Sequence, residues 1–296
     1  LAVKPIVSAA RAPKPLASFL SPWAPESLRL LGDAGVAAFR TPEGCADALR
    51  AYFDWRAPVS VAVDCPFGQD IVAALAGKQS QALEERAALA LFGRMGVPVV
   101  PARLAVEPDL AHDVPYPVVA KIASPDILHK TEAGGVVLDL RDRASFEQAA
   151  RGLLASVRSQ HPNARIDGVL VQPMERGLAE VIVGYRRDPL IGPTVLVGVG
   201  GRLAELYRDV AVRLAPVDGT EAMAMIEAVR GLAVLRGYRN LPRGDIASLV
   251  RTIVLVSHLA TIPRVGEAEI NPLIVRRDGE GVVAVDGLIV VADRQL

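Results

Sequence analysis

The chain has 296 residues, of which 51% are hydrophobic, and its 33 basic residues balance 33 acidic ones. This length allows about two domains, and the apolar fraction is enough for ordinary buried cores, so a disordered chain is excluded. The zero formal net charge offers no basic surplus for binding nucleic acid or an anionic membrane. No apolar run approaches the ~18 residues that a membrane-spanning helix needs.

The two cysteines, Cys45 and Cys65, stand in dissimilar contexts and predict neither a disulfide framework nor a metal site. A reducing cytoplasm is therefore the expected location. No secretory signal is expected, because Lys4 and Pro5 come before any apolar segment could form. The chain begins without Met inside an expected strand, so we expect a fragment of a longer protein.

Residues 1–57 predict roughly two β/α units. Thr41 has the character of a helix N-cap, because Pro42 follows it at the first helical position. Residues 58–79 contain scattered Pro and Gly with little periodicity and predict a linker. The elements expected in the first region are a strand over 1–7, a helix over 26–32, a strand over 36–40 and a helix over 41–55.

Residues 80–296 predict a second, mixed α/β domain. Ser80 resembles an N-cap, and apolar residues recur after it at helical spacing as far as Gly96. Several later connections are too short for a helix, which favours a mixed or antiparallel sheet with helices on one face over a doubly wound domain. The expected strands are 97–100, 118–122, 136–140, 168–172, 180–185, 194–199, 269–275 and 282–291, and the later helices are 144–159, 219–235 and 245–262.

Lys121 ends an otherwise apolar strand that reads Pro-Val-Val-Ala-Lys-Ile over residues 117–122. Only five of the 33 basic residues are lysines, so each lysine is informative. A lysine that packed neighbours hold in place can set one positive charge against a phosphate chain. The alternative is a strand-end lysine that extends its ammonium group into solvent.

The loop over residues 124–136 combines His129 and Lys130 with the paired glycines Gly134 and Gly135. Paired glycines allow backbone N–H groups to approach a phosphate closely. The imidazole of His129 could accept a phosphoryl group on a ring nitrogen near neutral pH. The alternative is a hairpin connection in which the glycines serve only the turn geometry.

Two expected strands flank a turn that contains Met174 and Gly177. Strand backbone left unpaired beside Pro173 could form hydrogen bonds with an adenine edge, and Glu180 could accept hydrogen bonds from ribose hydroxyls. The alternative is a buried hairpin without a ligand.

Oxygen donors gather near the C-terminus, where Glu269 and Asn271 are followed fifteen residues after Asn271 by Asp286. Two adjacent hairpin strands would bring Asn271 and Asp286 close together. Carboxylate and amide oxygens suit Mg²⁺, which takes one or two protein ligands together with phosphate and water. A polar hairpin is the alternative, but the order of lysine, glycine loop and oxygen donors along the chain favours one joint site.

Taken together, these motifs closely resemble the ATP-grasp half of the NDP-forming acyl-CoA synthetases, which are relatives of succinyl-CoA synthetase. The resemblance covers about residues 80–296 and implies an α/β chain with an ATP-grasp fold of two α+β subdomains. It also implies that residues 1–57 are the C-terminal part of a flavodoxin-like CoA-ligase domain. The motifs that carry it are residues 117–122, 124–136, 171–174 (Val-Gln-Pro-Met), 187–189 (Arg-Asp-Pro), 213–216 (Arg-Leu-Ala-Pro) and 269–273 (Glu-Ile-Asn-Pro-Leu).

The resemblance implies a role for each matching residue. His129 would relay phosphate to the nucleotide, and Glu269 would orient the phosphohistidine. Asn271 and Asp286 would be the Mg²⁺ ligands. The nucleotide contacts would come from Lys121 on the phosphates, Gly134 and Gly135 in the glycine loop, Gln172, Pro173 and Met174 at the adenine hinge, and Glu180 on the ribose.

The implied reaction is carboxylic acid + CoA + ATP ⇌ acyl-CoA + ADP + phosphate, through a phosphohistidine. The expected partners are the nucleotide, with ATP or ADP and Mg²⁺ as cofactors, and the missing CoA-binding and ligase domains, where CoA would be a substrate. A homo-oligomer is possible, and neither nucleic acid nor membrane is expected. Two alternatives stay open: a regulatory nucleotide-sensing ATP-grasp module of a protein acetyltransferase-like fusion, and a carboxylate–amine ligase. Neither alternative needs His129.

Overall fold

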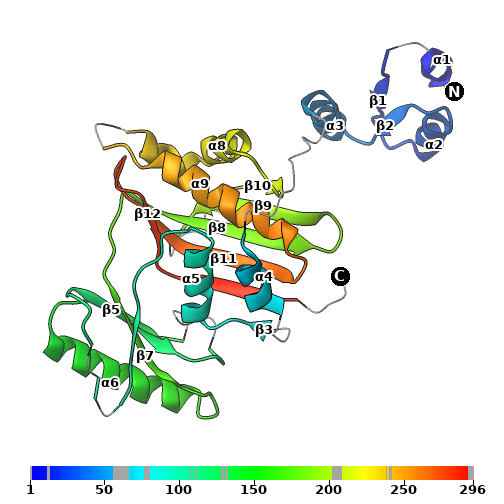
Figure 1. Ribbon diagram of the computed structural model, residues 1–296. Helices are drawn as coiled ribbons and strands as arrows, with labels where there is room; N and C mark the ends of the chain where they lie inside the picture. Colours follow the sequence, from blue (N-terminus) through cyan, green and yellow to red (C-terminus); the bar gives the residue numbers. More distant parts are fainter. Residues whose placement is uncertain are drawn as a thin grey trace. The chain divides into compact units, whose positions relative to one another are not determined.

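The computed structural model describes residues 2–11, 14–55, 67–76, 81–107, 109–110, 112–127, 130, 133–201, 209–237, 239 and 242–292. The chain divides into two compact units, residues 1–60 and residues 61–296 (Figure 1). No helix within the described residues combines the length and the apolar character that crossing a membrane requires.

The first unit is a small α/β unit around two parallel strands, β1 (Ala17–Phe19) and β2 (Ala37–Phe39). The Thr41 hydroxyl accepts a hydrogen bond from the Gly44 amide at 3.2 Å, which confirms the predicted N-cap. The strand expected over residues 1–7 is wrong, because Pro5 lies in the first turn of a helix, where its missing N–H has no cost. The helices are α1 (Lys4–Ala9), α2 (Pro25–Asp33) and α3 (Pro42–Asp54).

The second unit contains a seven-stranded sheet in which every neighbouring pair is antiparallel. Its strand order is β10-β9-β8-β11-β13-β3. The short strand β12 pairs with the C-terminal end of β11, after the stretch of β11 that pairs with β13. Of the two predicted arrangements, mixed or antiparallel, the structure has the antiparallel one. The strands are β3 (Gln81–Ala82), β8 (Ala179–Asp188), β9 (Gly192–Val199), β10 (Val210–Leu214), β11 (Val265–Val275), β12 (Val282–Ala284) and β13 (Gly287–Val291).

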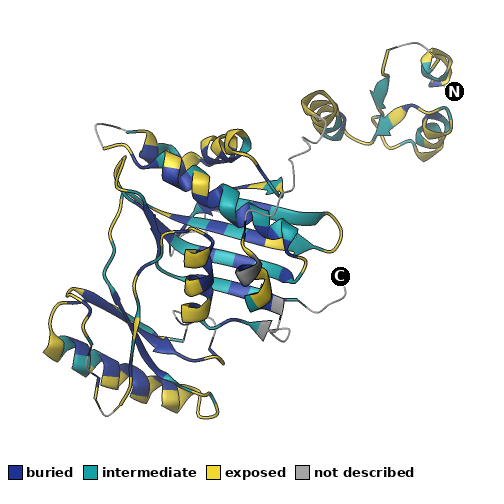
Figure 2. Cartoon of the chain, viewed as in Figure 1, coloured by how far each residue is buried: buried dark blue, intermediate teal, exposed yellow. Residues whose placement is uncertain are grey.

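One face of this sheet packs against helices in a single hydrophobic core. Along β8, the side chains of Val181, Val183 and Tyr185 are buried, whereas the alternate residues are more exposed. The outer surfaces of the covering helices are exposed (Figure 2). Because these helices share one core with the same face of the sheet, the predicted arrangement of helices on one face is confirmed. The helices are α4 (Gln69–Ala76), α5 (Glu85–Arg94), α8 (Gly219–Ala228), α9 (Ile246–Ser257), and the 3₁₀ helices η1 (Arg230–Arg236) and η3 (His258–Thr261).

A separate four-stranded antiparallel sheet has the order β4-β7-β5-β6 and packs against α6 (Arg143–Gln160). Ala120 and Ile122 of β5 lie in the core under α6, whereas Lys121 between them points to the opposite face. The same alternation on β7 turns Gln172 to that opposite face. The strands are β4 (Arg103–Ala105), β5 (Val118–Ala123), β6 (Val136–Leu140) and β7 (Gly168–Pro173).

Four local expectations differ from the structure. The helix expected from Ser80, which lies outside the described residues, begins only at Glu85, because Gln81–Ala82 pairs with β13 as a strand. Residues 69–76, expected as part of a linker, form α4, whose Ile71 and Leu75 are buried. Residues 97–100 form only an isolated bridge through Val99, and the strand expected over 282–291 is interrupted between β12 and β13.

Candidate functional site

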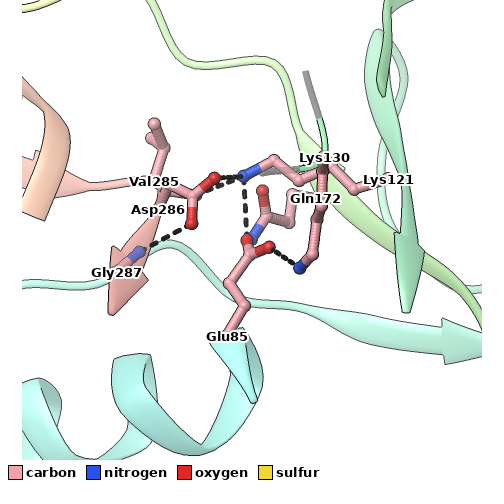
Figure 3. A network of polar contacts seen from close by, with 7 residues as sticks. All are labelled: Glu85, Lys121, Lys130, Gln172, Val285, Asp286 and Gly287. Atoms are coloured by element: carbon pink, nitrogen blue, oxygen red, sulfur yellow. Dashed lines mark hydrogen bonds and ion pairs between the residues drawn. The ribbon is translucent and has the colours of Figure 1, made fainter. Parts of the chain in front are cut away.

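Within the second unit, a buried polar network joins the four-stranded sheet (the small sheet) to helix α5 and to the connection between β12 and β13 in the seven-stranded sheet (Figure 3). At its centre is the ammonium group of Lys121, which is 6% exposed. Because an ammonium group has three donors, all of them can be satisfied here by protein acceptors. The acceptors are Oε1 of Glu85 at 2.8 Å, the carbonyl oxygen of Val285 at 2.8 Å and Oδ2 of Asp286 at 3.1 Å.

Glu85, the first residue of α5, supplies the carboxylate that organises this network. One oxygen accepts from Lys121 and, at 3.2 Å, from Nε2 of Gln172, and the other oxygen accepts from Lys130. Burial alone would raise the pKa of the Glu85 carboxyl, but the adjacent Lys121 and Lys130 ammonium groups outweigh it and lower that pKa. The carboxylate therefore stays ionised at neutral pH.

The charge of Lys121 is stabilised in the same way. Burial would lower the pKa of its ammonium group, but the carboxylates of Asp286 and Glu85 outweigh this effect and raise the pKa. Lys121 therefore stays protonated in a position from which water is largely excluded. A fixed, poorly solvated cation of this kind suits the recognition of an anion.

Our sequence reasoning missed Glu85, although the sequence does contain a signal for it. Glu85 shares one face of α5 with Ala88, Leu89 and Phe92, all of which are buried. A carboxylate at the apolar positions of an amphipathic helix is seldom fully buried without a partner. The missing partners, Lys121 and Lys130, are distant in the sequence.

Asn271 and Asp286 lie opposite one another where two neighbouring strands are both irregular. Ile270 pairs with Gly287 and Leu273 pairs with Ala284, which leaves Asn271–Pro272 facing Val285–Asp286. This is the proximity that the hairpin predicts. In the pairing of β11 with β8, Asn271 and Pro272 form a bulge, which redirects side chains.

The donor set here fits a hard cation of the magnesium type. Asn271 has a side-chain amide whose nitrogen donates to Oε1 of Glu269 at 3.2 Å, which leaves the amide oxygen available as a ligand. Asp286 is 36% exposed at its side chain, and its Oδ1 accepts from the Gly287 amide at 2.8 Å. Among the described residues there is no group of three or more His, Cys, Asp or Glu side chains that could hold a metal. A cation at Asn271 and Asp286 would therefore need phosphate or water oxygens as further ligands.

At the expected adenine hinge, Gln172 and Met174 are already engaged with other groups of the protein. The side chain of Gln172 is buried and donates to Glu85, so it belongs to the charged network. The Met174 amide donates to the Pro117 carbonyl at 2.8 Å and is already engaged. Among the described residues, the pairing of β4 with β7 ends at Val171, so that edge of β7 has no strand beside Gln172 and Pro173.

The paired glycines have unequal structural roles. Gly134 has a left-handed φ of +64°, with open space where a Cβ would lie. A Cβ on Gly135 would come within 2.8 Å of the Ile122 side chain and 3.0 Å of the Lys130 carbonyl oxygen. The Gly135 amide also donates to that carbonyl at 2.7 Å, so a close glycine turn fixes the backbone at Lys130.

Of the remaining expected residues, Glu180 lies apart from the charged network and His129 lies outside the described residues. Glu180 is exposed on β8, where its carbonyl accepts from the Gly200 amide at 2.8 Å. A Cβ on Gly201 would lie 2.3 Å from Oε2 of Glu180, so Gly201 leaves room for that carboxylate. The network itself thus joins Lys121, Gln172 and Asp286, from the expected set, with Glu85 and Lys130.

Comparison with known proteins adds a family match and homologous sequences. The ATP-grasp domain model matches residues 73–291. The beta subunit of ADP-forming acetate–CoA ligase I from Pyrococcus furiosus is 34% identical over 218 residues, which cover 72% of this chain and 93% of that subunit. The ADP-forming acetate–CoA ligase I of Archaeoglobus fulgidus is 40% identical over 176 residues, which are 59% of this chain and 26% of that ligase. The matched part thus spans about a quarter of that longer protein.

Solved structures show the same similarity. Acetyl-coenzyme A synthetase 1 of Ca. Korarchaeum cryptofilum, in complex with coenzyme A and Ca-AMPCP, has a TM-score of 0.68 and 32% identity, and covers 76% of this chain and 99% of that one. A second structure of that synthetase carries Mg-AMPPCP, with its phosphohistidine segment pointing towards the nucleotide binding site. Its TM-score is 0.63 and its identity 30%, over 76% of this chain and 99% of that one.

Proposed function

This chain belongs to the ATP-grasp family of the NDP-forming acyl-CoA synthetases, and we propose that it is the nucleotide-binding phosphotransfer module of an acid–CoA ligase. The reaction of the complete ligase would be carboxylic acid + CoA + ATP ⇌ acyl-CoA + ADP + phosphate. The CoA-binding and ligase functions would come from partner domains or a partner subunit, because the matched part spans only a fraction of the longer relative.

The observation that carries this proposal is the pairing of Lys121 with Asp286 beside Asn271. Phosphoryl transfer requires mainly that the phosphates be positioned and their charge neutralised. Lys121 would hold the phosphate chain, and Asn271 and Asp286 would hold Mg²⁺. When bound, Mg²⁺ would neutralise the phosphate charge.

His129 would be the phosphate carrier between the two half-reactions. A neutral ring nitrogen would form an N–P bond to the terminal phosphoryl group of ATP while the P–O bond to ADP breaks. Glu269 would orient the phosphorylated ring. Two observations support this role. Lys130, the next residue along the chain, donates a hydrogen bond to Glu85 in the network. A homologous synthetase has a phosphohistidine segment that points towards its nucleotide site.

The experiment that tests the proposal is phosphate transfer from γ-labelled ATP in the presence of Mg²⁺. We expect the chain to acquire a label that is labile in acid and stable in base, the signature of a phosphohistidine. The His129→Asn variant should acquire none. A chain that binds ATP but takes no label would contradict the phosphotransfer role and would favour a regulatory nucleotide-sensing module.

A further inference from the structure

The three acceptors on the Lys121 ammonium group leave no donor free for a ligand (Figure 3). A phosphate oxygen can therefore bind Lys121 only by replacing one of them. The identity of the displaced acceptor determines what else must happen when the ligand arrives.

The three acceptors differ in how readily they can leave. The Val285 carbonyl is main chain, and Val285 is held to β11 by its own amide, which donates to Pro272 at 3.2 Å. The Glu85 side chain is 3% exposed and is held by Lys130 as well. The Asp286 side chain is 36% exposed. Asp286 is therefore the acceptor that a ligand can displace.

Charge balance sets the condition for that displacement. Among the described residues, the charged groups bonded to Lys121 are Glu85 from α5 and Asp286 from the β12–β13 connection, and Lys130 donates to the other oxygen of Glu85. Within the described part of the network, two lysine side chains are thus paired with two carboxyl groups without any ligand. A phosphate that displaced Asp286 without a metal would leave that carboxylate beside another anion, and such like-charge contacts are strongly unfavourable.

We infer that Asp286 is a specificity-determining residue that competes with phosphate for Lys121, so that the site accepts the magnesium–nucleotide complex and disfavours free nucleotide. Mg²⁺ would take the Asp286 carboxylate as a ligand across from Asn271 and so release Lys121 to the phosphates. Metal and nucleotide would then bind with reciprocal positive coupling. This inference rests on the proposed nucleotide-binding function.

The test is calorimetric titration of ADP with EDTA present and, separately, with excess Mg²⁺. The variant Asp286→Asn should bind ADP in EDTA more tightly than the unaltered protein, by roughly 5-fold or more, which is the lower end of typical coupling between sites. The same variant should lose most of the gain that Mg²⁺ provides. Asp286→Ser serves as a second variant, and a melting curve establishes that each protein is folded.

Two controls distinguish competition at Lys121 from a general change in charge. Asp167→Asn removes one carboxylate of similar exposure, 31%, from a surface pair with Arg165, and should leave ADP affinity unchanged. In a Lys121→Met background, Asp286→Asn should give no gain in EDTA, because the cation for which Asp286 competes is absent.

The outcomes separate this inference from the function on which it rests. If the unaltered chain binds Mg²⁺–ADP while Asp286→Asn and Asp286→Ser gain nothing in EDTA, the competition is refuted and the proposed function stands. A gain that persists in the Lys121→Met background also refutes it. If the unaltered chain binds no ADP in either condition, the nucleotide-binding function itself fails.

Discussion

The Lys121 ammonium nitrogen lies 2.8 Å from Oε1 of Glu85, a residue that precedes it by 36 positions in the chain. The contact ties the first turn of α5 to the middle of β5. It holds a protonated lysine inside the protein, on the face of the small sheet that is turned away from α6. The site therefore depends on a carboxylate that itself need not touch any ligand.

Removing the charge of Glu85 should destabilise the second unit. Glu85→Gln would leave Lys121 and Lys130 without their shared counter-ion, and breaking a buried pair in this way costs about 3–5 kcal/mol. Glu84→Gln, at the neighbouring half-buried position, should change stability by no more than about 0.5 kcal/mol. Denaturant unfolding followed by far-UV circular dichroism measures both, since the two tryptophans, Trp23 and Trp55, lie in the first unit. Equal midpoints for Glu85→Gln and the unaltered chain would contradict the role of Glu85.

The same carboxylate predicts a particular loss of stability in acid. Because the pKa of Glu85 is lowered in the folded chain, its stabilisation is present above the unfolded carboxyl pKa of about 4.3 and is lost as the pH falls through the lower folded value. Unfolding midpoints measured from about pH 6 down to about pH 3 should therefore fall more steeply for the unaltered chain than for Glu85→Gln. Parallel pH profiles would show that Glu85 contributes no charge-dependent stability.

Replacing glycine by alanine should have opposite effects in the glycine turn at Lys130 and in the exposed part of helix α6. Gly135→Ala would force a Cβ against Ile122 and the Lys130 carbonyl, and overpacking of this kind costs about 1–3 kcal/mol. Gly152→Ala, inside α6 with nothing within 4 Å of the added Cβ, should stabilise the chain by about 0.5–1 kcal/mol. Thermal unfolding of the two variants provides the comparison. A neutral Gly135→Ala would mean that the turn at Lys130 is not closely packed.

Much of the fold follows from local sequence patterns. The strands β5, β6, β7, β8 and β9 and helix α6 were predicted within a few residues, because their apolar periodicity agrees with their tertiary surroundings. The prediction failed where distant pairing decides the structure. Gln81–Ala82 is a strand only because Val290 and Val291 lie beside it, and no local signal at residue 80 carries that information. The short helix α4 has too few residues to show a clear period.

The site was predictable to the same extent. Lys121 could be selected because it ends an apolar strand, and Asp286 because it is an oxygen donor on a strand expected beside Asn271. The contact between Lys121 and Asp286 follows from the fold. The place of Gln172 could not be predicted, since the alternation of β7 sets its direction but only the position of Glu85 sets its partner. The whole network depends on where α5 begins, and that start depends on the long-range pairing of β3.

His129 should be needed for phosphate transfer and not for nucleotide binding. As a phosphate carrier it makes no ground-state charge contact, so His129→Ala should keep ADP affinity within about 1 kcal/mol. In the full-length ligase the same change should reduce turnover severely, because the relay step is lost. Steady-state acyl-CoA synthesis together with ADP titration measures both effects. Near-normal synthesis by a His129→Asn enzyme would refute the relay.

The most direct test of the central claim is calorimetric titration of ADP, with Mg²⁺ present, into the unaltered chain, Lys121→Met and the exposed control Lys14→Met. A hydrogen bond to a charged group contributes about 1.5–3 kcal/mol, so Lys121→Met should weaken ADP binding by about tenfold or more. The unaltered chain and Lys14→Met should bind ADP equally. Absence of ADP binding by the unaltered chain, or equal affinity in Lys121→Met, would contradict the assignment of this network as the nucleotide site.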